Sequence, residues 1–130
     1  MKAEPVNGKY DRLPPALELE ALKVLWADQE ELTVAKVREA MKPNRRLAYT
    51  TVLTLLERLF RKGLVTRRKR GRGYSYRPAL ERDAALDIAL DRLVNDFFGN
   101  SRQRLLSHLE QTVAASQDES SPRQLDSVLL

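Results

Sequence analysis

An amphipathic helical pattern that runs directly into a short hairpin pattern constrains this chain more than any other feature. Within residues 48–62, four apolar residues follow the i, i+3, i+4, i+7 spacing of one buried helix face: Val52, Leu55, Leu56 and Leu59. Gly63 suits the end of this helix. Two short strand patterns then flank residues 70–73, whose glycines permit the positive φ of a tight turn. The segment therefore predicts a helix followed by a two-stranded hairpin.

The positive charge of the chain is concentrated in this same segment. Residues 44–77 contain eleven Lys and Arg side chains and a single acid, Glu57, whereas the whole chain has a net charge of +5. The remaining residues therefore carry a net charge of −5. Cations this dense repel one another when no polyanion is present, and the hairpin itself contains no acid for ion pairing. The focused charge favours binding to the phosphate backbone of nucleic acid.

Two further helical patterns precede this segment. The first covers residues 16–29 and the second covers residues 34–41, with Thr33 as the expected N-cap of the second helix. Residues 1–12 are polar, contain Pro5 and Gly8, and are expected to be flexible. Three helices followed by a two-stranded wing predict a winged helix-turn-helix DNA-binding domain over residues 13–79. The predicted fold class is mainly α with a small β-hairpin.

Residues 80–115 carry two more amphipathic patterns, which we expect to form a helical dimerisation region. The helices are predicted at about 82–98 and 102–115, with Ser101 as the N-cap of the second. Their apolar faces have no obvious partner within the chain, so a second copy is expected to cover them. The expected dimer contacts are Ile88, Leu93, Val94, Phe97, Phe98, Leu105, Leu106 and Leu109. Residues 116–130 are rich in Ser, Asp and Gln, which predicts a disordered tail.

The face of the 48–62 helix opposite the leucines carries residues that we expect to read DNA. A helix fits the major groove, where residues near its N-terminus reach the base edges. Hydroxyl and backbone N–H groups at that end also hold phosphates. The predicted DNA contacts are Tyr49, Thr50, Thr51, Thr54 and Arg58 in the helix and Arg67, Arg68, Lys69, Arg70 and Arg72 in the hairpin. The alternative is a basic surface that is merely solvated.

Composition narrows the other classes of function. The chain has no Cys and a single His, His108, so most catalytic and metal-binding constellations cannot be built. We therefore predict neither an enzyme nor a metal or cofactor. No apolar run approaches the ~20 residues of a membrane-spanning helix, and residues 1–12 lack the apolar core of a signal peptide. A cytoplasmic protein is expected.

Two other functions remain open from the residues alone. The first is a winged-helix module that binds an acidic protein through its hairpin. The second is a regulator that senses a small ligand between its C-terminal helices, although only about 35 residues would form that pocket. The focused charge and the polar face of the 48–62 helix favour DNA over both.

Four segments carry a resemblance to a known family. LELEALKVLW at 17–26, TVAKVREAM at 33–41, LAYTTVLTLLERLFRKGLV at 47–65 and GRGYSYRP at 71–78 resemble the BlaI/MecI family of penicillinase repressors. The resemblance covers about residues 13–115. It implies a homodimeric repressor whose winged helix binds a palindromic operator, with Thr50, Thr51 and Thr54 in the recognition helix and residues 70–73 at the tip of the wing. Ala48 stands where relatives can carry a capping Ser.

The resemblance also implies how repression ends. Members of this family are typically cleaved in the dimerisation region when a membrane-embedded zinc metalloprotease sensor is activated. Cleavage releases DNA because each half-site alone binds weakly. Some members are cut at an Asn-Phe bond, and the nearest equivalent here is the pair His108-Leu109. A related copper-responsive branch uses C-terminal cysteines, which this chain lacks.

Overall fold

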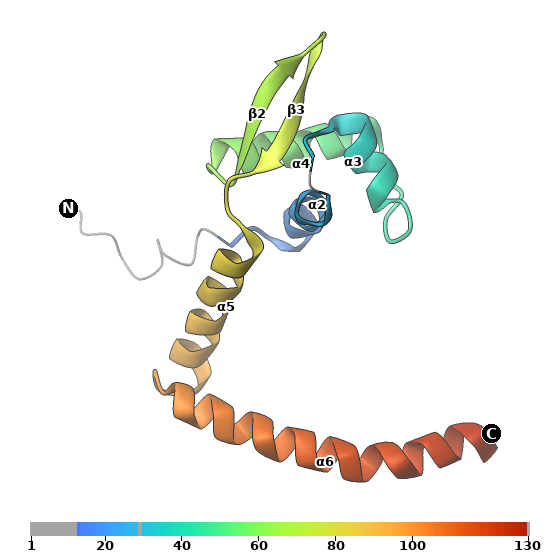
Figure 1. Cartoon of the computed structure of the whole chain (residues 1–130), viewed down its shortest axis with the longest axis vertical. Helices are drawn as coiled ribbons and strands as arrows, with labels where there is room; N and C mark the ends of the chain where they lie inside the picture. Colours follow the sequence, from blue (N-terminus) through green and yellow to red (C-terminus); the bar gives the residue numbers. More distant parts are fainter. Residues whose placement is uncertain (1–12, 29, 130) are drawn as a thin grey trace. The chain divides into compact units, whose positions relative to one another are not determined.

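The computed structural model describes the backbone of residues 13–28 and 30–129 and the side chains of residues 13–28 and 30–116. Residues 1–12, which the sequence predicts to be flexible, lie outside this range. The elements are α2 (Ala16–Ala27), β1 (Leu32–Thr33), α3 (Val34–Met41), α4 (Tyr49–Arg61), β2 (Val65–Arg70), β3 (Gly73–Pro78), α5 (Arg82–Phe97) and α6 (Arg102–Leu129) (Figure 1). Two compact units divide the chain at residues 1–89 and 90–130, so the division falls inside α5.

The first unit is a winged helix, which confirms the predicted fold class. Helices α2, α3 and α4 pack against one another, and the hairpin β2–β3 stands beside α4 (Figure 1). The leucine face of α4 forms the centre of the core, as its spacing predicts. Side chains from every element of this unit join it, among them Leu22, Leu25, Val37, Val52, Leu56, Leu59, Leu64 and Tyr76.

The sheet has three strands in the order β1-β3-β2, all antiparallel. Strand β1 is only two residues long and was not predicted, because two residues carry no periodic signal. It pairs with β3 at Leu32 and Thr33. The hairpin closes through Gly71 and Arg72, and Gly71 has a φ of 59°. A positive φ at the first central residue alone is the feature of a type II′ turn, which matches the twist of the strands.

The ends of the helices follow local chemistry. The side chain of Thr33 accepts a hydrogen bond from the backbone N–H of Lys36 at 3.3 Å, so this predicted N-cap is confirmed. At the other end of α4, Gly63 adopts a φ of 78°. The backbone N–H of Gly63 donates to the Phe60 carbonyl and that of Leu64 donates to the Leu59 carbonyl, which is the Schellman arrangement. Helix α4 therefore stops one turn before the hairpin begins.

An ion pair with one buried partner fixes the same end of α4 to α2. Lys62 Nζ donates to Glu18 Oε1 at 2.7 Å, and the side chain of Glu18 is only 5% exposed. Glu18 lies in the first turn of α2, where a negative charge favours the helix dipole. The ion pair also satisfies its burial, because a buried carboxylate needs a charged or hydrogen-bonding partner.

The C-terminal helices differ from the expectation in two respects. The first half of α5 belongs to the winged-helix unit, where Ala85 is buried and Ile88 packs against the core. Helix α6 does not end near residue 115 but runs on to Leu129, so its backbone is helical in the segment predicted to be a disordered tail. That prediction was based on composition, which does not take into account that extending an existing helix costs less free energy than nucleating a new one. Within the described residues, no helix is long and apolar enough to cross a membrane.

Candidate nucleic-acid interface

Helix α4 presents a polar stripe on the side away from the core. Thr50, Thr54, Arg58 and Arg61 are exposed, and Tyr49 is 49% exposed at the helix start. Thr51 is half-buried. The hydroxyl of Thr54 donates to the carbonyl of Thr50 at 3.0 Å, which leaves its methyl group and its oxygen lone pairs on the surface. The stripe offers hydroxyl, methyl and guanidinium groups within four helical turns, which is the chemistry that reads a major groove.

Ala48 provides no side-chain cap for the start of α4, as the sequence indicates. Two arginines stabilise the preceding loop instead. Arg38 Nε donates to the Leu47 carbonyl at 2.8 Å, and Arg45 forms an ion pair with Glu20 at 3.3 Å. The first backbone N–H groups of a helix have no partner within it, so an uncapped N-terminus is open to an external hydrogen-bond acceptor such as a phosphate oxygen.

The inner face of the hairpin, which is turned toward α4, holds Arg67. Its NH1 group donates to Glu57 Oε2 at 2.6 Å. Its guanidinium carbon lies 3.9 Å from the ring centre of Phe60 and 4.1 Å from that of Tyr74. The side chain is 19% exposed. Although burial acts to lower the pKa of Arg67, the ion pair with Glu57 raises it overall, so the guanidinium remains charged.

Tyr76 lies directly across the strands from Arg67 and is fully buried. Burial raises the pKa of its phenol, and the nearby Arg67 guanidinium acts in the opposite direction. Its hydroxyl makes no hydrogen bond within normal distance to any described residue. Tyr76 therefore anchors the hairpin to the core by packing.

The outer face of the hairpin is organised around Glu31, which directly precedes β1. Ser75 Oγ donates to Glu31 Oε1 at 2.7 Å, and Arg68 donates to the same oxygen through Nε at 3.2 Å. Arg70 and Arg77 approach the carboxylate at 3.9 and 4.0 Å. The hydrogen bond from Ser75, together with Arg68 and Arg77, holds the pKa of Glu31 below its usual value against the effect of burial.

The hairpin itself contains no acid, but two acids from elsewhere in the domain pair with its cations. The acids come from outside the hairpin, because Glu57 belongs to α4 and Glu31 precedes β1. Because Glu57 is the single acid of residues 44–77, its pairing with a hairpin cation could have been predicted from the sequence. The pairing of Glu31 could not, since its position depends on the unpredicted strand β1. Cations without an ion pair to residues 13–28 and 30–116 remain on the hairpin and on α4, namely Lys69, Arg72, Arg58 and Arg61.

The eight residues expected at a dimer contact differ in their exposure. Three are covered within the protomer: Ile88 packs against the winged-helix core, and Val94 and Leu105 are buried. Phe98 is half-buried, and its ring lies tilted at 52° to that of His108 with the ring centres 5.7 Å apart. Exposed apolar side chains remain in the second unit at Leu93, Phe97, Leu106 and Leu109, and Val113 joins them. Phe97 stands out because 75% of its surface is exposed.

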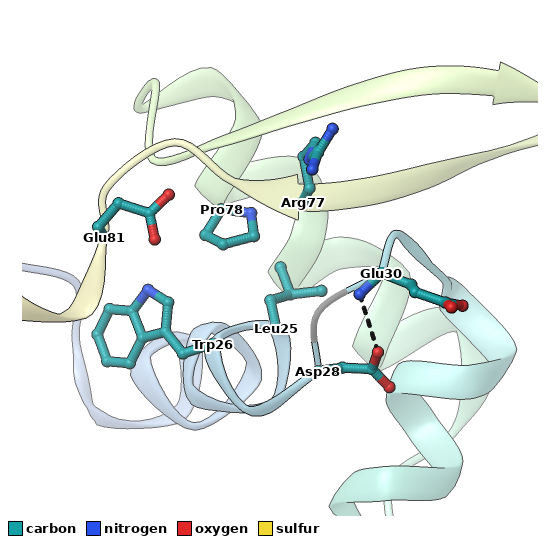
Figure 2. Close-up of a pocket in the computed structure, with 7 residues that line it drawn as sticks. All are labelled: Leu25, Trp26, Asp28, Glu30, Arg77, Pro78 and Glu81. Atoms are coloured by element: carbon teal, nitrogen blue, oxygen red, sulfur yellow. Dashed lines mark hydrogen bonds between the residues drawn. The ribbon is translucent and has the colours of Figure 1, made fainter.

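One cavity of the first unit does not resemble a site for an anion. Figure 2 shows the pocket beneath the C-terminal end of β3, with a volume of about 180 Å³. Asp28, Glu30 and Glu81 surround it with a single cation, Arg77, and Trp26 closes one side. The indole N–H of Trp26 donates to the Leu80 carbonyl at 2.8 Å, so it serves the fold. Among the described residues, no three His, Cys, Asp or Glu side chains are grouped to bind a metal.

A second cavity, of about 330 Å³, lies within the C-terminal unit. Phe98, Arg104, Ser107 and His108 are among the residues that line it. This volume is at the lower end of the range of about 300–1,000 Å³ typical of ligand sites. Phe98 is the one apolar residue among the six that line it.

Known proteins are similar to this chain over most of its length. The model of the penicillinase repressor family matches residues 15–126. Transcriptional regulator BlaI of Mycobacterium tuberculosis is 36% identical over 110 residues, which cover 84% of this chain and 80% of that protein. The penicillinase repressor of Bacillus licheniformis is 29% identical over 94 residues, or 72% of this chain and 73% of that protein. These names confirm the prediction of a transcription regulator rather than an enzyme.

A solved structure also aligns with part of the chain. The DNA-binding domain of the repressor BlaI covers 55% of this chain and 89% of its own length, at 27% identity and a TM-score of 0.48. The family model reaches from α2 into α6, and the resemblance inferred from the sequence motifs is confirmed. The chain belongs to the penicillinase repressor family.

Proposed function

We propose that this protein is a dimeric transcription repressor that occludes a promoter by binding a palindromic DNA operator. One observation carries the proposal: the exposed stripe of α4 and the exposed cations of the hairpin belong to the same unit. A polar helix face beside a cationic hairpin suits a base-reading element flanked by a backbone-holding element. Because the proposed ligand is chromosomal DNA, the protein acts in the cytoplasm.

The two elements have different tasks in this proposal. Tyr49, Thr50, Thr51 and Thr54 contact base edges or nearby phosphates from the first turns of α4, with Arg58 further along the same face. The hairpin holds the adjacent backbone through Arg68, Lys69, Arg70 and Arg72, whose side chains are all exposed. Arg68 and Arg70 are near Glu31, but their exposed guanidinium groups keep donors available, since each Arg has five.

The proposed dimer uses the exposed apolar residues of the second unit. Leu93, Phe97, Leu106 and Leu109 are the members of the predicted set that remain available for a second copy. Val94 and Leu105 support this surface from within the protomer. Joining two weakly binding domains on one palindrome raises the affinity, because the second contact becomes intramolecular.

Substitutions in the two elements separate base reading from phosphate binding. Arg70→Ala and Arg72→Ala each remove one proposed phosphate contact, so each should weaken binding to every duplex and reduce the slope of log affinity against log salt by about 0.9. Thr50→Ala or Thr51→Ala should change the sequence preference with little effect on that slope. Fluorescence anisotropy on operator and random duplexes over a salt series measures both quantities.

Arg104→Ala is the matched control, because it removes one cation from α6, outside the proposed interface. It should leave the slope unchanged. If the threonine and arginine variants all lost the same affinity on operator and random DNA, base reading by α4 would be rejected. If no variant mattered and the wild type preferred an acidic protein to DNA, the protein-interaction module would replace the proposal.

We also propose that repression ends by proteolysis through a membrane-embedded metalloprotease sensor, as the family resemblance implies. The bond between His108 and Leu109 lies in α6, and both side chains are exposed. A helical segment must open locally before a protease can bind it in extended form. Co-expression with a metalloprotease encoded beside this gene should yield two fragments by mass spectrometry, and a chain that stays intact after induction would contradict the proposal.

A further inference from the structure

Arg67 is enclosed on three sides by residues of the protein itself. Phe60 covers one face of its guanidinium and Tyr74 contacts it as well, with centroid distances of 3.9 and 4.1 Å. Glu57 accepts a hydrogen bond from NH1 at 2.6 Å. A planar guanidinium can stack on rings and donate along its edge at the same time, whereas an ammonium is a compact point charge. We call Glu57, Phe60, Arg67 and Tyr74 the Arg67 clamp.

The clamp joins the two elements of the proposed interface. Glu57 and Phe60 are one turn apart on α4, Arg67 is in β2 and Tyr74 is in β3. The contact lies outside the apolar core and between the recognition helix and the hairpin, whose strands are only six residues long. A two-stranded hairpin is poorly stable alone, so its direction depends on its contacts with the rest of the domain. The clamp adds a contact with α4 to the pairing with β1 and to the buried Tyr76.

Its neighbour Arg68 is in a different situation. Successive residues of a strand face opposite sides, so Arg68 points to the outer face and meets Glu31 there. Its side chain is 66% exposed, compared with 19% for Arg67. The two adjacent arginines have the same charge, but the side chain of Arg68 is mostly exposed and that of Arg67 is mostly covered.

We propose that Arg67 is a positioning residue that fixes the hairpin against α4 and does not contact phosphate. This proposal rests on the proposed DNA-binding function. By setting the direction of the hairpin relative to α4, the clamp decides whether both elements contact an operator together. It therefore contributes to the preference for operator over random DNA, and not to the non-specific electrostatic affinity that every duplex shares.

Three variants test the clamp in the full chain by anisotropy on operator and random duplexes. Arg67→Gln should lower operator affinity about tenfold, the scale expected when ring contacts and an ion pair are lost together. Arg67→Lys should also lower it, because an ammonium cannot stack on both rings and donate along its edge at the same time. Phe60→Leu does not change the charge of the protein and should also lower operator affinity, because it removes a ring that contacts Arg67. All three should leave the salt slope on random DNA unchanged, because no phosphate contact is removed.

A phosphate-binding Arg67 gives the opposite pattern. Arg67→Lys would then keep most of the affinity, since Lys also binds phosphate. Arg67→Gln would reduce the slope on random DNA by about 0.9, and Phe60→Leu would have no effect. Any of these results would overturn the positioning role. The double variant Phe60→Leu/Arg67→Gln adds a further check, because members of one clamp should not lose affinity additively.

The design separates failure of this inference from failure of the proposed function. Arg72→Gln is the matched variant, since Arg72 lies at the turn and has no ion pair within the described residues. It should lower the slope on both duplexes. A wild type without operator preference rejects the proposed function itself. A wild type with that preference but an unaffected Arg67→Lys rejects the clamp alone.

A measurement on the wild type covers the case in which an Arg67 variant does not fold. In the nuclear magnetic resonance spectrum of the free protein, the Arg67 side-chain protons should be shifted upfield by the rings that face them. Phe60→Leu should relieve part of that shift. A resonance at the position of an exposed arginine would contradict the clamp.

Discussion

Arg67 and Arg68 are neighbours in the sequence, but strand alternation places them on opposite faces of the hairpin, where each meets a different acid. Glu57 is ten residues from Arg67 and Glu31 is 37 residues from Arg68. Local patterns in the sequence carry no information about such pairs. Residue counting therefore treats all hairpin cations alike, whereas the structure separates those held by the protein from Lys69 and Arg72, which have no ion pair within its described part.

Glu31 makes the stability of the hairpin depend on pH. Its pKa is lowered in the folded protein, first by the hydrogen bond from Ser75 and then by Arg68 and Arg77. A carboxylate with a lowered folded pKa stabilises the fold fully above its unfolded value of about 4.3, and this contribution is lost as the pH falls through the folded value. Glu31→Gln should therefore reduce the melting temperature at pH 7 and match the wild type in strong acid.

Glu30→Gln is the control for this prediction. Glu30 is exposed and its side chain makes no ion pair within the described residues. Its substitution should change the melting temperature little at any pH. A constant difference between Glu31→Gln and the wild type across the whole range would show that the lowered pKa does not contribute to stability.

At the scale of elements, the structure agrees with the sequence where the signals are local. Helix α3 has the predicted bounds of 34–41, and α4 begins and ends one residue inside the predicted 48–62. Apolar spacing, the Thr33 cap and Gly63 determine both. Strand β1 and the packing of Ile88 in the first unit could not be predicted, because both depend on partners more than 40 residues away or on the tertiary core.

The end of α4 offers a test of one such local signal. Gly63 has a φ of 78°, and nothing lies within 4 Å of the position that a Cβ would take. Gly63→Ala should therefore cost only the conformational penalty of an L-residue in the left-handed region, about 1–2 kcal/mol in urea unfolding. Gly73→Ala is the matched control, since its φ is not positive and the site is equally open. Equal effects of the two substitutions would refute this account of the helix end.

At the scale of the whole molecule, the exposed apolar residues of the second unit carry the proposed dimer. Phe97→Glu places a charge on the most exposed of them and should weaken self-association at least about tenfold, as for a central interface residue. Sedimentation equilibrium measures this change. Asn95→Glu adds the same charge at an exposed polar position of α5 and should leave the association intact. If both variants still formed the dimer, the dimer contact would lie elsewhere.

The first compact unit extends beyond the hairpin into α5. The winged-helix unit includes α5 as far as Ala89, so a fragment that ends near residue 79 lacks Ala85 and Ile88, which pack in its core. The predicted boundary at 79 was drawn from the end of the hairpin pattern. The tertiary contacts of the first half of α5 were not readable from that pattern, since the same residues also fit a dimer face.

The most direct test of the central proposal is a titration of the full-length protein against the duplex upstream of its own gene and against a scrambled duplex. Fluorescence anisotropy over a salt series gives the affinity, the stoichiometry and the slope. The account predicts two protomers per duplex, an affinity many-fold above that for scrambled DNA and a steep loss with salt. Equal, weak binding to both duplexes would contradict it and would leave only a non-specific basic surface.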